Sequence, residues 1–399
     1  MGDFFDSRPY PGWAAMTPAA PQSCVVLVAG ETSGDQHGAR VVSAMQQKDP
    51  GLFFCGIGGP ALQQAGVRIV ADAASLSVVG ITEVFAKLPA IINGLAVMKK
   101  LLKSLRPELL ILIDFPDFNL CVAATAKKLG IPVLYYISPQ VWAWRRGRVR
   151  RIARLVDHMA VILPFEENFY RQHDVPVTFV GHPLLDDPSA LSRQSLKITD
   201  IDRPVIGLLP GSRSGEIARH LPVMLETAAV LKAELKRAEF IISHAPSVLK
   251  KQIDTLMAQH PGAAGFEVIS GPVETVFERS DVVVAASGTV TLQAALHGTP
   301  MVIIYRVSPV SFWLGRALVR VPHIGLVNLV AGRQIVAELV QHDARADKIA
   351  AAVGGLLHDK NELNILKRQL LGLHDLLGGP GAAARVADIA LGLLDQPAA

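Results

Sequence analysis

Two carboxylates and an amide follow an apolar run in the stretch LLILIDFPDFN, which covers residues 109–119. The apolar residues predict a buried strand, and Asp114, Asp117 and Asn119 come after it. A solvated turn would account for one acid, but not for both with Pro116 between them. A carboxylate at the end of a core strand can accept a proton from a hydroxyl group, so the stretch is a candidate for general-base chemistry.

A second candidate site follows the first predicted strand, in VAGETSGD at residues 28–35. Its glycines and small hydroxyl side chains, placed before a predicted helix, would let a ligand approach the backbone amides. Glu31 and Asp35 would repel a phosphate, so they suit sugar hydroxyls or a general base better. The alternative is a glycine-rich turn that only connects strand and helix.

Two loops later in the chain have the features of an anion site. In LLPGSRSGEI, residues 208–217, a strand leads into Gly211, Ser212 and Arg213 before a helix begins. Free amides at a helix start, together with a guanidinium, can bind a diphosphate. A capped helix with a surface arginine is the alternative interpretation.

The second of these loops is AASGTVTLQAALHGTP, residues 285–300. Ser287, Gly288 and Thr289 offer hydroxyl and backbone donors where another helix begins. Two such loops in one domain can hold a single nucleotide diphosphate between them.

Other motifs give weaker signals. GIGGPA at 56–61 matches a dinucleotide fingerprint but follows the second strand and contains Pro60, so we do not expect a nicotinamide or flavin site. The sequence has no phosphate-binding G-x-x-x-x-G-K-[ST] motif, no evident Asp-x-Asp metal site and no metal-ligand spacing of Cys or His. We therefore expect no cofactor and no obligatory metal in the chemical step.

The segment SPQVWAWRRGRVRRIAR, residues 138–154, combines six arginines with two tryptophans. It is compatible with a solvated helix face, with nucleic-acid binding or with an anionic lipid head group. No other basic tract supports nucleic acid as a partner.

An apolar segment at residues 76–98 has two interpretations. It is either a core-facing helix or an interfacial membrane patch, because its apolar side chains occupy more than one stripe. The candidate membrane-facing residues are Val79, Ile81, Val84, Phe85 and Leu88. The uncharged stretch between Asp281 and Arg306 contains Gly and Pro residues that divide it, so we expect no spanning helix there.

Strands alternate with helices along most of the chain, which predicts an α/β fold with parallel sheets. The alternation pauses in a polar, proline-rich stretch after residue 182 and then restarts. We expect two Rossmann-like domains facing each other across a cleft, at residues 23–188 and 189–346. Residues 1–22 are expected to be a disordered extension without the features of a signal peptide, and residues 347–399 to be helices that pack on the body or on a partner subunit.

Composition narrows the class of protein. Half of the 399 residues are hydrophobic, which is enough for two large cores, and the net charge is only +4. Three scattered cysteines fit a reducing compartment such as the cytosol.

Taken together, the ordered motifs resemble the lipid-A-disaccharide synthases, a family of bacterial glycosyltransferases. The resemblance runs from about residue 25 to the C-terminus. It is carried by VAGETSGD, DFPDFN, YISPQVWAW, VGHPL, LLPGSR, SGTVTLQAAL, PMVIIYR and NLVAGR, in that order. It implies the two-domain GT-B architecture and a cytoplasmic enzyme peripheral to the inner membrane, with a homodimer as one assembly.

The resemblance also implies a reaction. The family joins UDP-2,3-diacylglucosamine to the monosaccharide lipid acceptor 2,3-diacylglucosamine 1-phosphate, giving a β-1,6-linked disaccharide 1-phosphate and UDP, with inversion at the anomeric carbon. A UDP-sugar epimerase and a non-catalytic lipid-binding protein stay open as alternatives, because the first would share the fold and the second would explain the apolar segment.

The family's functional residues carry over onto matching positions. The resemblance implies that Asp117 is the family's proposed catalytic acidic residue and that Glu31 is a further active-site acid. We expect Asp117 to act as the base, because Pro116 would direct Asp117 rather than Asp114 into the cleft. The resemblance also implies that Arg213 and Asn328 serve activity and nucleotide-sugar binding. Gln293 departs from the glutamate that the family usually has there, so its contact with the nucleotide ribose would lack a charge.

Overall fold

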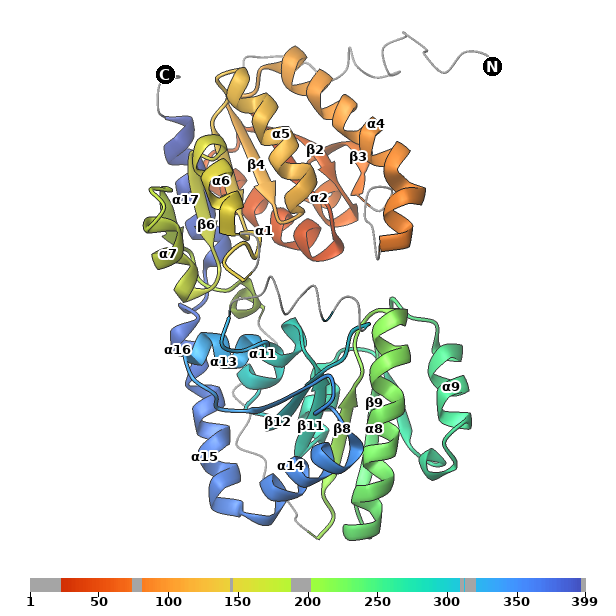
Figure 1. Ribbon diagram of the computed structural model, residues 1–399. Coiled ribbons are helices and arrows are strands. Elements are labelled where there is room, and N and C mark those ends of the chain that lie inside the picture. Colours follow the sequence, from red (N-terminus) through yellow and green to blue (C-terminus); the bar gives the residue numbers. More distant parts are fainter. Residues whose placement is uncertain are drawn as a thin grey trace, which may run out of the picture. The chain divides into compact units, whose positions relative to one another are not determined.

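The computed structural model describes residues 23–73, 81–143, 146–187, 202–308, 312 and 321–395. The chain divides into two compact units (Figure 1). The first unit comprises residues 1–183 and 381–399, and the second comprises residues 184–380. The expected extension at 1–22 and the candidate residue Val79 lie outside the described residues, as do the side chains of residues 81–87.

The first unit is built on a seven-stranded parallel sheet with the strand order β3-β2-β1-β4-β5-β6-β7. Its strands are β1 (Cys24–Ala29), β2 (Phe53–Gly58), β3 (Arg68–Asp72), β4 (Leu109–Ile113), β5 (Val133–Tyr136), β6 (His158–Val161) and β7 (Val177–Phe179). Its helices are α1 (Thr32–Lys48), α2 (Pro60–Gln64), α4 (Ile81–Leu105), α5 (Pro116–Lys128), η2 (Arg146–Arg148), α6 (Val149–Leu155), α7 (Pro164–Arg171) and α17 (Ala382–Leu394), and η3 (Pro183–Asp186) lies where the units divide.

Strand β1 shows why this sheet needs helices on both faces. Its side chains alternate between two hydrophobic cores, since successive residues of a strand point to opposite faces. One core includes Val26 and Val28, with Leu101 of α4 and Ala123 of α5. The opposite core includes residues of α1 and α17, and all six residues of β1 are buried. The predicted uninterrupted apolar strand is therefore explained by burial from both sides.

The second unit repeats this arrangement with a six-stranded parallel sheet in the order β10-β9-β8-β11-β12-β13. Its strands are β8 (Val205–Leu209), β9 (Glu239–His244), β10 (Glu267–Ser270), β11 (Val282–Ala286), β12 (Met301–Tyr305) and β13 (Ala337–Val340). Its helices are α8 (Ser214–Glu234), α9 (Lys250–Ala258), η4 (Pro261–Ala263), α10 (Glu274–Arg279), α11 (Thr289–Leu296), α13 (Leu326–Ala331), α14 (Ala346–His358), α15 (Lys360–Leu371) and α16 (Leu373–Leu376).

Both sheets are doubly wound. In each, the chain first adds strands outward on one side of the first strand and then returns to add the remaining strands on its other side. This change of side lies between β1 and β4 in the first unit and between β8 and β11 in the second. Ligands of such sheets bind at the carboxyl ends of the two strands at this point. The motifs around Glu31 and Asp114 follow β1 and β4, and those around Arg213 and Ser287 follow β8 and β11, so each unit carries its candidate residues where the topology favours a site.

The segment that was expected at 347–399 is shared between the units. Helices α14, α15 and α16 belong to the second unit, whereas α17 packs on α1 of the first. Val386, Ala387, Ala390 and Leu393 of α17 are buried in the first unit's core. An ion pair between Lys48 and Asp388 lies beside them. The chain therefore returns to the first unit at its end.

Candidate functional site

The loops after β1 and β4 pack directly against each other. A Cβ atom on Gly30 would lie 2.2 Å from the ring of Phe115, so only glycine permits this contact. Phe115 in turn stacks on Phe118, with ring centroids 5.1 Å apart. This packing fixes the position of Asp114 relative to Glu31 at the ends of neighbouring strands.

Asp114 is held in an unusual backbone conformation. Asp114 and Phe115 both have positive φ, at 46° and 49°, a region that non-glycine residues seldom adopt. The Asp114 carbonyl accepts hydrogen bonds of 2.6 Å from Asn119 Nδ2 and 2.6 Å from the Tyr135 hydroxyl. These bonds offset the cost of the strained turn and explain why the amide of Asn119 accompanies the two acids.

The carboxyl group of Asp114, at the end of β4, has a shifted pKa. Burial first, and then the negative charge of Glu31, raise its pKa to about 6. A hydrogen bond from the Phe115 amide opposes the rise. The main chain of Asp114 thus supports the turn, and its side chain is a carboxyl group with a raised pKa.

Asp117 lies in the first turn of α5, which begins at Pro116. Its side chain is 75% exposed and forms a 2.7 Å ion pair with Arg148 Nη2. Proline suits the first helical position because no hydrogen bond is lost there. The basic segment 138–154 therefore supplies a counter-charge to the candidate base, a contact that the sequence did not indicate.

The two acids of VAGETSGD differ in environment. Glu31 precedes α1, is exposed and makes no capping bond to that helix. Asp35 is buried and accepts hydrogen bonds from the amides of Gly59, Ala61 and Leu62, at 2.6, 2.9 and 3.2 Å. This carboxylate occupies the amides at the start of α2 that a dinucleotide phosphate would need, so GIGGPA serves a structural purpose.

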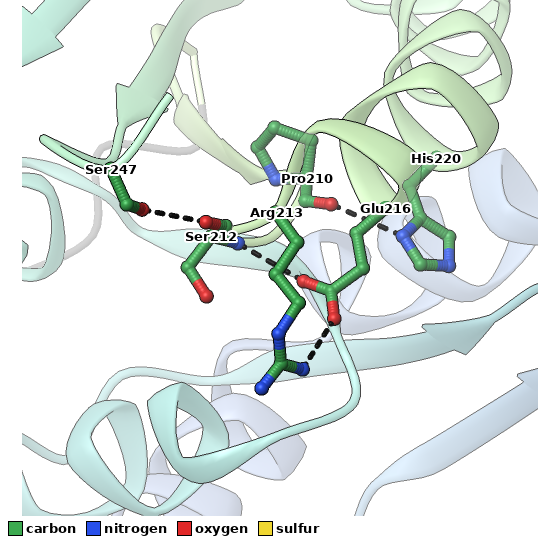
Figure 2. Close-up of polar contacts among 6 residues, drawn as sticks. All are labelled: Pro210, Ser212, Arg213, Glu216, His220 and Ser247. Carbon is green, nitrogen blue, oxygen red and sulfur yellow. Dashed lines mark hydrogen bonds and ion pairs between the residues drawn. The ribbon is translucent and has the colours of Figure 1, made fainter. Parts of the chain in front are cut away.

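In the second unit, the loop between β8 and α8 converges on one carboxylate (Figure 2). Glu216 accepts a 3.1 Å hydrogen bond from the Ser212 amide and a 3.0 Å hydrogen bond from Arg213 Nη1. Ser247 Oγ donates to the Ser212 carbonyl over 2.6 Å. Gly211 has a φ of 118°, a backbone conformation that glycine adopts readily because it has no Cβ atom.

His220 joins this loop to the end of β12. Its Nε2 accepts a 3.0 Å hydrogen bond from the Arg306 amide, so its Nδ1 carries the proton that is donated to the Pro210 carbonyl over 3.1 Å. Burial lowers the pKa of His220, which keeps the imidazole neutral for both contacts. His220 was not among the residues expected at the site.

The loop after β11 is tied to the segment before α13. Ser287 Oγ donates to the Ile324 carbonyl over 3.2 Å, and Thr291 Oγ1 donates to the Gly288 carbonyl over 2.8 Å. Thr289 at the start of α11 is exposed. Gln293 Nε2 lies 3.4 Å from a carboxylate oxygen of Glu274, so a glutamate at position 293 would face a like charge.

Asn328 has no exposed surface and its amide is fully engaged by the chain. Its Oδ1 accepts from the amides of Ile335 and Val336, and its Nδ2 donates to the Val336 carbonyl and to Glu338 Oε1. Glu338 also accepts from the amides of Ile324 and Gly325. Asn328 could bond a ligand only by giving up one of these contacts, so in this structure it positions the loop.

A buried carboxylate that sequence reasoning missed organises the SPQVWAW segment. Glu166 accepts hydrogen bonds from Ser138 Oγ at 2.5 Å, Trp142 Nε1 at 2.9 Å and the Leu163 amide at 3.0 Å. Burial outweighs the opposing effect of these donors, and the pKa of Glu166 rises to about 6. Its partners lie up to 28 residues away in the sequence, so no local motif signalled the cluster.

Residues 81–98 of the apolar segment belong to α4, which extends from Ile81 to Leu105. Leu88 and Ile92 are exposed, at 46% and 58%. Ile81, Val84 and Phe85 lie in the part of α4 whose side chains are not described. Among the described residues no helix has the length and apolarity to cross a bilayer, and no three Cys, His, Asp or Glu side chains cluster as metal ligands would.

Comparison with known proteins gives a consistent result. The family model for lipid-A-disaccharide synthetase matches residues 25–374. The lipid-A-disaccharide synthase of Geobacter metallireducens is 48% identical over 383 residues, covering 94% of this chain and 99% of that protein. The enzyme of the same name from Syntrophus aciditrophicus is 48% identical over 380 residues, covering 93% and 98%.

Solved structures resemble the fold. The UDP complex of MnaA from S. aureus has a TM-score of 0.62 and 11% identity, covering 94% of this chain and 99% of that one. The UDP-GlcNAc 2-epimerase from Neisseria meningitidis has a TM-score of 0.57 and 13% identity, covering 93% and 99%. The calicheamicin glycosyltransferase CalG4 has a TM-score of 0.58 and 14% identity, covering 95% and 100%. At these identities the likeness concerns the fold alone, which consists of two Rossmann-like units.

Proposed function

This chain belongs to the lipid-A-disaccharide synthase family, and on that premise we propose which of its residues carry the reaction and how it meets its substrates. It is a glycosyltransferase, a hexosyltransferase of lipid A biosynthesis, and the family assignment favours this activity over the epimerase and lipid-binding alternatives. The proposed donor is UDP-2,3-diacylglucosamine and the proposed acceptor is 2,3-diacylglucosamine 1-phosphate.

We assign the nucleotide end of the donor to the second unit. Arg213 and the Ser212 amide are solvent-accessible donors beside the start of α8, a helix of 21 residues whose N-terminus favours an anion. Ser287, Gly288 and Thr289 begin α11 after the neighbouring strand β11. As the bond to the sugar breaks, charge develops on the leaving UDP, and these donors would stabilise it.

We assign the general base to Asp117 in the first unit. An acceptor hydroxyl is a weak nucleophile at neutral pH, so a carboxylate must take its proton during attack on the anomeric carbon. The exposure of Asp117 supports this role because a substrate can reach it. Its partner Arg148 would hold the carboxylate in a defined orientation. Glu31 and Asp114, at the ends of neighbouring strands, are the next candidates.

The test is an assay that follows UDP release and disaccharide formation together. We expect Asp117→Asn to lower turnover by about 10²–10⁴-fold while the affinity for UDP stays unchanged, since only proton transfer is removed. Asp254→Asn, which removes an exposed carboxylate from α9, is the matched control and should retain full activity. Retention of more than about a tenth of the activity by Asp117→Asn would transfer the base role to another group.

We further propose that the enzyme works at the cytoplasmic surface of the inner membrane, and that it does so as a homodimer. One stripe of α4 supports the membrane contact. Leu88, Ile92, Lys99 and Lys103 project within roughly 60° of one another on a regular helix, with the apolar pair first and the lysines after it. Apolar side chains can enter the head-group region while lysines meet anionic lipid.

Replacing the apolar pair tests this contact. We expect Leu88→Ser with Ile92→Ser to reduce co-sedimentation with vesicles of anionic phospholipid, because each inserted side chain contributes up to about 1.5–3 kcal/mol. The melting temperature should hardly change, since both side chains are already exposed. Leu249→Ser with Ile365→Ser removes two exposed apolar residues from the second unit and should not affect binding. Equal vesicle binding by both double variants would exclude this face of α4.

A further inference from the structure

The proposed diphosphate site already contains an anion that belongs to the protein. Ser212 N–H and the Arg213 guanidinium both point at Glu216, which binds each of them with a different carboxylate oxygen (Figure 2). These are the same donors to which the proposed function assigns the diphosphate. The Arg213 and Glu216 side chains are 56% and 31% exposed, so a ligand in solution can reach the pair.

The loop is shaped to accept this carboxylate. A Cβ atom on Gly211 would lie 2.5 Å from Glu216 Oε2 and 2.8 Å from its Cβ, so glycine is required for the approach. The Ser247 and His220 contacts hold the Ser212 and Pro210 carbonyls from other sides. These contacts fix the main chain in the anion-binding form. The Glu216 side chain, in contrast, can leave the two donors by rotating about its own torsions.

We propose that Glu216 is an internal counter-anion that UDP must displace, an inference that rests on the proposed binding of the diphosphate at Ser212 and Arg213. A carboxylate and a phosphate cannot both occupy one pair of donors, and like charges at that distance repel. Before substrate binds, Glu216 satisfies the donors and keeps the loop ordered. After transfer, it competes with UDP for them and so promotes release of the product.

The charge of the ligands makes this competition selective. The terminal phosphate of UDP is linked only through its anhydride bond and carries close to two negative charges above its second pKa of about 6. In a UDP-sugar the same phosphorus is esterified and carries one. The Glu216 charge therefore opposes the product more than the donor substrate. A residue that only caps α8 would not discriminate between the two ligands.

Calorimetry and steady-state kinetics of Glu216→Gln at pH 8 test the proposal. Glutamine keeps an acceptor for the Ser212 amide but removes the charge. We expect UDP to bind about two- to tenfold tighter, uridine to bind as before, and the inhibition constant of UDP to fall more than the KM of the UDP-sugar. Glu226→Gln, an exposed change on the same helix, should alter none of these values. Unchanged or weaker UDP binding by a folded Glu216→Gln would overturn the proposal.

A second measurement uses the unaltered protein, so it does not depend on the folding of a variant. In a crystal structure with UDP, the Glu216 carboxylate should have left Ser212 N and Arg213. A complex in which it still holds both would overturn the proposal. Arg213→Ala separates the two levels of inference. If it leaves UDP affinity unchanged, the proposed diphosphate site is wrong; if it weakens binding while Glu216→Gln does not tighten it, only the counter-anion role fails.

Discussion

At the scale of single residues, four carboxylates of similar sequence context have four different environments. Asp35 serves a helix start, Asp114 is largely buried beside Glu31, Asp117 is exposed next to Arg148, and Glu166 sits in a fully internal cluster. Their chemical type is the same, so solvation and partners decide which of them exchanges a proton near neutral pH. For Asp114 this leads to a test in which stability, rather than activity, is measured.

We expect Asp114→Asn to remove part of the protein's pH dependence of stability. The pKa of Asp114 is about 6 in the folded state and 3.8 in the reference state, so the folded state holds its proton more tightly. The stabilising contribution of the protonated form is present below about pH 4 and is lost as the pH rises through 6. Asparagine cannot ionise and tolerates positive φ. The variant should gain about 1–3 kcal/mol over the wild type between pH 5 and pH 8.

The measurement is urea unfolding of both proteins at pH 5 and pH 8. Asp254→Asn removes an exposed carboxylate instead and serves as the reference for a general charge effect. If the free energy of unfolding changed equally for wild type and Asp114→Asn between pH 5 and pH 8, the Asp114 carboxyl would have to be hydrated in the folded state.

At the scale of elements, short helices near the site depend on tertiary hydrogen bonds. Helix α13 has six residues, too few for stability on its own. The Asn328 amide and the Glu338 carboxylate attach it to β13, and Ser287 attaches the preceding segment to the loop after β11. An asparagine inside α13 therefore ties this helix to the segment that leads into β13.

We expect Asn328→Ala to lower the free energy of unfolding by about 3–5 kcal/mol, because four hydrogen bonds are lost and two backbone amides, one buried and one partly buried, are left without this acceptor. Turnover should fall together with the melting temperature. Asn168→Ala changes an exposed asparagine of α7 and should leave both as they are. A variant that lost UDP binding while melting within about 2 °C of wild type would instead indicate direct contact of Asn328 with the ligand.

At the scale of the whole molecule, the order of the chain and the division into units do not coincide. The last helix, α17, completes a face of the first unit's sheet after the chain has built the second unit. Arg385 Nε donates to the Val180 carbonyl over 2.8 Å, which ties α17 to a segment 205 residues earlier. The first unit is therefore assembled from two distant parts of the sequence.

We expect truncation after Pro380 to destabilise the first unit while the second keeps its own unfolding transition. The truncation would expose the apolar face that Val386 and Leu393 cover, a loss of more than about 4 kcal/mol. Differential scanning calorimetry should show one transition shifted to lower temperature. Truncation after Asp395 leaves α17 intact and is the control. A common shift of both transitions would contradict independent stability of the two units.

Several features follow from local sequence alone, because they depend on neighbours along the chain. Alternating apolar runs and helical stretches predict both parallel sheets, and the residues after each strand mark Glu31, Asp117, Arg213 and Ser287 as candidates. A parallel strand must be followed by a turn at the ligand-binding edge, so motif and topology coincide there. The ordered motifs also identify the family before any coordinates are considered.

Other features were decided only by the tertiary structure, since they depend on contacts between residues far apart in sequence. Burial distinguishes Asp114 from Asp117, and partners 24 and 28 residues away create the Glu166 cluster. No local sequence pattern indicates that the Asn328 amide is buried and fully hydrogen-bonded within the chain, or that α17 returns to the first unit. Desolvation and hydrogen-bond pairing are set by what the fold packs around a side chain, and a short sequence window does not contain that information.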